Sequence, residues 1–112
     1  MTVRDLVQDA AREIRTGDLT PGRASDLLAE LTSLLSTVLT EIRDADMAYA
    51  SVLLRHLDSE EAANRAKIRA QTTLEYARAR EAKDTKDVLL EMIRSLKIVL
   101  RTMQEEMRFT PR

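Results

Sequence analysis

The sequence has almost no residues that interrupt helices. Its only glycines are Gly17 and Gly22, Pro21 is one of its two prolines, and neither residue type occurs between Arg23 and Thr110. Glycine and proline are the strongest breakers of regular structure, so this scarcity predicts long helices. The absence of cysteine excludes disulfides and thiolate metal sites. Aromatic residues make up only 3% of the chain, and no apolar run approaches the roughly 20 residues of a transmembrane helix.

What remains is a mixture of 44% hydrophobic and 33% charged residues with a net charge of −1. Such a mixture, rich in Ala, Leu, Glu, Lys and Arg, is typical of coiled coils and helical bundles. A length of 112 residues suits one domain, so we expect a single helical domain over residues 1–112. With no signal-peptide pattern in the first residues, a cytoplasmic protein is expected.

Apolar periodicity and capping residues predict three helices, over residues 3–16, 21–57 and 59–108. Thr2 with Asp5 predicts a capping box at the first start, and Gly17 is expected to end that helix. Thr20 is expected to cap the second helix.

The 21–57 helix has an apolar arc about 140° wide, which includes Leu39 and Leu57 and favours contact with more than one neighbour. Asp58–Ser59 is the expected break, with Ser59 as the next N-cap and residues 60–61 complementing the helix start.

We read the 59–108 helix as continuous through Asp84. The fold class expected is therefore all-α, an elongated, coiled-coil-like antiparallel hairpin with a short N-terminal helix, assembling into a multi-helix bundle. The third helix is the longest, and the first helix is expected to fold over its protruding end. Its apolar residues are Leu74, Val88, Leu89, Met92, Leu96, Val99, Leu100, Met103 and Met107.

A basic stripe runs along the opposite side of the third helix, within an arc of about 80°. Its members are Arg65, Arg69, Arg80, Lys83, Arg94, Arg101 and Arg108. Such a stripe suits the phosphates of a nucleic acid. A solvated face with intrahelical ion pairs is the reading that we favour for it, and a face for a protein partner is a further alternative.

Several apolar residues lie off the main apolar faces, which is ordinary for scattered surface residues and is also the pattern of a self-association surface. They are Met47, Leu54, Leu90 and Ile98. Together with the wide apolar arc, they lead us to expect a homo-oligomer, a dimer or higher.

No catalytic or metal motif is present. His56 is the only histidine, and Leu53 stands where a di-iron Glu-x-x-His pair needs its acid. Helical nucleotide pyrophosphatases hold Mg²⁺ with Glu-Glu-x-x-Glu followed by Glu-x-x-Asp, and Glu41 with Asp44 matches the second element alone. We therefore expect no enzyme activity, cofactor, metal or small-molecule substrate.

Four segments resemble small all-helical proteins of bacteriophages that infect high-GC bacteria: 19–24, 41–49, 92–97 and 105–108. The resemblance covers most of the chain and implies phage origin, hence a bacterial host cell or a virion, without a settled activity. We expect a non-enzymatic interaction or structural protein acting by self-association and protein contacts. The competing hypothesis is a nucleic-acid-binding accessory protein that uses the basic stripe.

Overall fold

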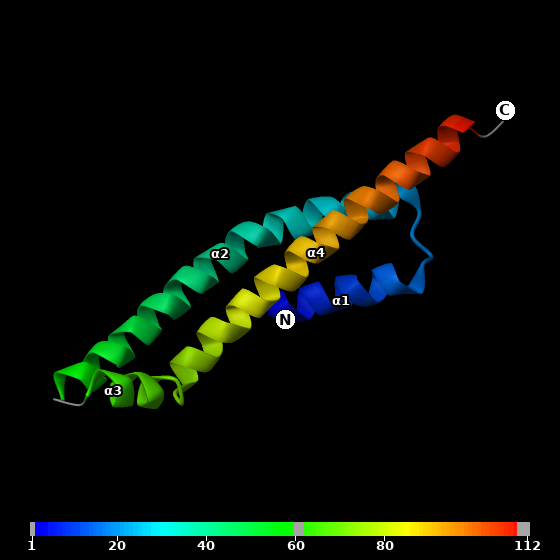
Figure 1. Cartoon of the computed structure of the whole chain (residues 1–112). Coiled ribbons are helices and arrows are strands. Elements are labelled where there is room, and N and C mark those ends of the chain that lie inside the picture. The colour runs from blue at the N-terminus through cyan, green and yellow to red at the C-terminus, as the bar shows by residue number, and fades with distance from the viewer. Residues whose placement is uncertain (1, 60–61, 110–112) are drawn as a thin grey trace. The chain divides into compact units, whose positions relative to one another are not determined.

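The computed structural model describes residues 2–59 and 62–109, and those residues form helices without strands. The elements in chain order are α1 (Val3–Thr16), α2 (Pro21–Asp58), α3 (Ala63–Ala70) and α4 (Leu74–Phe109) (Figure 1). The predicted all-α fold is confirmed, and α2 and α4 pack against each other as a hairpin requires.

Capping at α1 and at the start of α2 follows the prediction. The Thr2 hydroxyl accepts the Asp5 N–H at 3.1 Å, and the Asp5 carboxylate accepts the Thr2 N–H at 3.0 Å. The backbone hydrogen bond from Thr2 lowers the pKa of the Asp5 carboxyl. Gly17 ends α1 with φ of 75°, in the left-handed region that glycine adopts without strain. The Thr20 hydroxyl accepts the Arg23 N–H at 3.1 Å and caps α2.

Two helices follow α2, so the prediction of one continuous helix over 59–108 is wrong. The Thr72 and Thr73 hydroxyls donate to carbonyls of the last turn of α3 at 2.7 and 2.6 Å. Thr73 also accepts the Tyr76 N–H at 3.4 Å and so caps α4. Two threonines break the helix without glycine or proline because their hydroxyls compete for backbone hydrogen bonds. Beyond this break, α4 runs through Asp84 as one helix, as predicted.

The start of α3 also differs from the prediction. The Ser59 hydroxyl donates to the His56 carbonyl at 2.7 Å, so it belongs to the end of α2 and does not cap the next helix. Ala62 precedes α3 and provides no side-chain cap. The predicted contribution of residues 60–61 lies outside the described residues.

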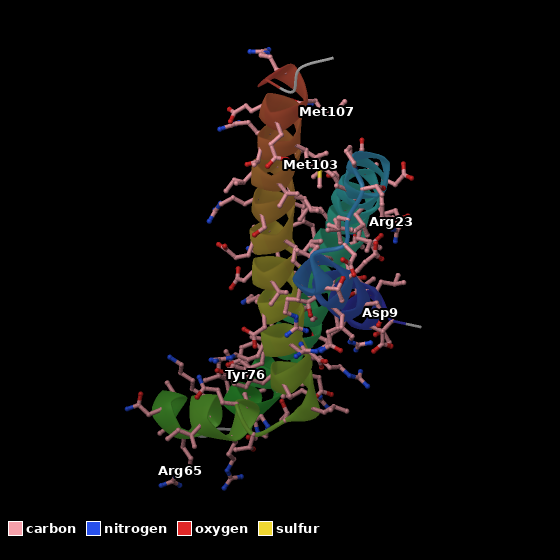
Figure 2. The ribbon with its side chains drawn as sticks, turned by 90° about the vertical axis from the view of Figure 1, so that its right-hand side faces the viewer. Asp9, Arg23, Arg65, Tyr76, Met103 and Met107 are labelled. Atoms are coloured by element: carbon pink, nitrogen blue, oxygen red, sulfur yellow. The ribbon has the colours of Figure 1, made fainter. Side chains whose placement is uncertain are left out.

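The chain forms two compact units, the first comprising residues 1–37 and 87–112 and the second residues 38–86. The prediction of a single domain stays a prediction. In the first unit, α1, the beginning of α2 and the end of α4 lie side by side (Figure 1, Figure 2). Their core consists mainly of large aliphatic side chains: Val7, Leu27, Leu31, Leu89, Met92, Ile93 and Leu96.

Cover over the end of α4 decreases along the helix. Leu96 is fully buried, Leu100 and Met103 are half-buried, and Met107 is 70% exposed (Figure 2). The 14 residues of α1 span only about 21 Å at 1.5 Å per residue. The predicted cover therefore stops before the last turn of α4.

The second unit has a core of smaller side chains. Its buried residues are Val38, Val52, Ala66, Ala70, Ala79 and Thr85. The Thr85 hydroxyl donates to the Glu81 carbonyl at 2.8 Å, which satisfies it inside the unit. Small side chains let helices approach closely but bury less apolar area, so this core contributes less hydrophobic free energy than that of the first unit.

Several side chains assigned to the apolar faces from the sequence are exposed instead. Leu39 and Leu57 on α2 are 50% and 38% exposed, and Leu74 and Val88 on α4 are 61% and 46% exposed. A helical wheel shows which side of a helix is apolar but not how much of that side a neighbour covers.

Candidate interaction surfaces

In the second unit, α2 and α4 meet along a seam of aromatic and charged side chains. The Tyr49 and Tyr76 rings lie 5.2 Å apart between centroids with a 50° tilt. The Arg80 guanidinium lies 6.0 Å from the Tyr76 ring centroid and donates to the Tyr76 hydroxyl at 3.4 Å, which raises the pKa of Arg80. The Lys83 Nζ lies 3.2 Å from the Asp46 Oδ1. Since contacts move backward on α2 as they advance on α4, the two helices are antiparallel here.

The predicted basic stripe divides between two helices. Arg65 and Arg69 lie on α3, and the side chain of Arg65 extends outward (Figure 2). The other five members lie on α4. The turn at Thr72 and Thr73 interrupts the constant advance of 100° per residue on which the stripe depended. One continuous stripe from residue 65 to residue 108 is therefore wrong, although all seven side chains are exposed.

Part of the basic set already contacts groups within the chain. The Arg94 Nη1 lies 2.7 Å from the Glu91 Oε1, and Arg80 and Lys83 belong to the seam between α2 and α4. The Arg94–Glu91 pair lies within one helix, as in a solvated face, whereas the Lys83 contact joins α4 to α2.

A groove of about 430 Å³ lies between α1 and α2 in the first unit. Arg23 donates to both carboxylate oxygens of Glu13 at 2.5 and 2.9 Å and lies 3.4 Å from a Glu30 oxygen. The hydrogen bond from Arg23 lowers the pKa of the Glu13 carboxyl, and the same contact raises the pKa of Arg23. Arg23 therefore serves two carboxylates, and with Asp9 the charged lining of the groove is negative overall. The apolar lining consists of Leu6, Ala10, Leu27, Leu31 and Leu34.

The sequence did not indicate this groove. Glu13 and Arg23 are ten residues apart on different helices, and only the turn at Gly17 brings them together.

The four predicted self-association residues are all exposed. Met47 and Leu54 lie on α2 in the second unit and are 64% and 58% exposed. Leu90 and Ile98 lie on α4 in the first unit and are 39% and 57% exposed. The structure therefore divides these candidates between the two units.

In residues 2–59 and 62–109, no group of three or more His, Cys, Asp or Glu side chains is placed to hold a metal ion. His56 is half-buried near the end of α2. Among the helices described, none is long and apolar enough to cross a membrane.

No protein-family model matches the chain, and neither the curated proteins nor the solved structures give a significant match. The resemblance to bacteriophage proteins therefore stays a prediction.

Proposed function

We propose that this protein is a non-enzymatic interaction protein that acts by self-association and protein contacts through the outer sides of its helices. Following the bacteriophage resemblance, the proposed place of action is the bacterial host cell or the virion. The observation that carries the proposal is an outer α2 stripe in the second unit. Its members are Arg43, Met47, Ala50, Leu54 and Leu57, all of them exposed.

Contiguity distinguishes the outer α2 stripe from ordinary surface residues. Single exposed apolar side chains are common on folded proteins, whereas contiguous apolar surface marks interaction sites. Met47 and Leu54 are seven residues apart and therefore almost eclipsed along the helix, with Ala50 between them and Leu57 one turn further on. Met47 and Leu54 are 64% and 58% exposed, so covering them stabilises an interface by about 1–2 kcal/mol for each.

The connections between helices also support an interaction role. α1 joins α2 through residues 17–20, and α3 joins α4 through residues 71–73. Catalytic groups are placed disproportionately on loops held by a rigid scaffold, and these short connections present few side chains. The sides of the helices provide far more surface for recognition.

Sedimentation velocity over a range of concentrations tests the proposal. We expect a dimer or higher species that dissociates near or below about 10 μM, where an association free energy of about −7 kcal/mol places the midpoint. If the chain remains monomeric at about 100 μM, its association free energy is weaker than about −6 kcal/mol. That result is incompatible with the proposed self-association.

Fluorescence anisotropy with labelled single- and double-stranded DNA tests the competing hypothesis. Phosphate contacts are strongest at low salt, so the test compares about 50 mM with about 200 mM salt. We expect no binding at either concentration. Binding that weakens steeply with salt would favour the nucleic-acid hypothesis instead.

A further inference from the structure

Apolar character on α2 extends to two sides of the helix within the second unit, and only one of them is covered. Val38 and Val52 are buried, at 0% and 4% exposure. Met47 and Leu54, on the outer side, are 64% and 58% exposed. Members of the outer α2 stripe follow one another at intervals of four, three, four and three residues, from 43 to 57. This spacing keeps them on one side of the helix, and it is the spacing of the core positions of a coiled coil.

The stripe is nearly symmetric about Ala50. Met47 lies three residues before it and Leu54 four after, while Arg43 and Leu57 are each seven residues away. In an antiparallel pair with Ala50 on a two-fold axis, Met47 of one copy therefore lies beside Leu54 of the other. The aliphatic stem of Arg43 likewise lies on Leu57. Alanine on the axis lets the helices approach while the longer side chains interdigitate.

Charges at the ends of the stripe match under the same symmetry. Arg43 lies seven residues before Ala50 and Asp58 eight after, about 60° apart around the helix. An antiparallel pair therefore brings Arg43 of one copy close to Asp58 of the other, and the two-fold axis repeats the pair. A parallel pair in register would instead bring the two Arg43 side chains together.

We propose that two copies of this chain associate through α2, antiparallel, about a two-fold axis at Ala50, with the outer α2 stripe as the contact. The inference rests on the proposed function, which it deepens by naming the partner, the face and the register. Charge complementarity and apolar pairing select one orientation, and both follow from residues within the second unit.

Sedimentation of matched aspartate variants tests the face. Met47→Asp should weaken dimerisation at least about a hundredfold, because the symmetric dimer buries Met47 twice. Ile68→Asp is the control, since Ile68 on α3 has the same 64% exposure and lies outside the stripe. Circular dichroism should show unchanged helix content in both variants. Equal dimerisation by Met47→Asp and the unchanged protein would overturn the proposed face.

Single-cysteine cross-linking tests the register, because the chain has no native cysteine. Ala50→Cys should form a disulfide-linked dimer under mild oxidation, since the two copies of position 50 meet at the axis. Leu57→Cys should not, because its two copies lie about 21 Å apart at 1.5 Å per residue. Cross-linking by both variants would show a parallel pair. Cross-linking by neither, with the unmodified protein still dimeric, would overturn this interface but leave the proposed function intact.

Charge reversal tests the orientation independently. Asp58→Arg should weaken the dimer by about tenfold, because two symmetry-related pairs become repulsive. Adding Arg43→Asp to the same chain should restore dimerisation to within about threefold. A double variant as weak as the single one would rule out the proposed pairing of Arg43 with Asp58. If the unmodified chain is monomeric at about 100 μM, both the interface and the proposed function fail.

Discussion

Leu96 lies at the centre of the first unit and gives the sharpest test of where its stability resides. Its side chain is 0% exposed on α4. Leu96→Ala removes three buried carbon atoms, each worth about 0.8 kcal/mol in transfer free energy, or about 2.4 kcal/mol together. A cavity contributes further, so we expect a loss of about 3–4 kcal/mol in the free energy of unfolding. That is a large fraction of the 5–15 kcal/mol typical of a small domain.

Urea denaturation at one fixed protein concentration measures this loss, because self-association would otherwise shift the midpoint. With a slope of about 1.5 kcal/mol/M, the midpoint should fall by about 2 M at an unchanged slope. Leu90→Ala is the matched control on the same helix and in the same unit, because Leu90 is 39% exposed. It should cost about 1.5 kcal/mol or less. Equal losses at the two positions would refute the assignment of the core.

Three further predictions concern the caps, the pH response and the packing of the second unit. Thr73→Ala should cost about 0.5–2 kcal/mol in urea denaturation by removing the cap of α4, and Thr73→Ser should restore most of it. The Glu13 carboxyl has a lowered pKa, so its pairing with Arg23 stabilises the fold above its ordinary pKa of 4.5 and is lost as pH falls below that value. Between pH 7 and pH 3, the melting temperature should fall less in Glu13→Gln than in the unchanged protein. An equal fall in the two proteins would contradict that contribution. Ala66→Leu should cost about 1–3 kcal/mol in urea by overpacking a fully buried site, whereas Ala63→Leu, which is exposed, should stay within about 0.5 kcal/mol.

Helix ends were predictable wherever one residue decides the local conformation. Thr2 with Asp5, Gly17 and Thr20 each act within one turn of their own position, so the sequence places α1 and the start of α2 correctly. The Thr72–Thr73 break was missed because threonine is tolerated inside helices. Its hydroxyls end α3 only where the chain turns, and there they bond to carbonyls of the preceding turn.

Candidate surfaces were predictable only in part. Met47 and Leu54 were identified from helical phase alone, because a residue far from the apolar arc of its helix faces outward. The groove between α1 and α2 could not be predicted in this way, because it depends on how α1 packs against α2. Helical phase also does not show that Lys83 on α4 contacts Asp46 on α2 across the seam.

The sequence by itself determined that this protein is helical, where α1 and α2 begin and which residues break the early chain. These properties depend on interactions within a few residues of one another. Tertiary structure alone decided that Leu39, Leu57 and Val88 remain exposed while Leu89 and Leu96 are buried. The physical reason is that helical phase fixes only the direction of a side chain. Burial depends on whether another helix lies in that direction, and for the outer α2 stripe we propose that the covering helix belongs to a second copy.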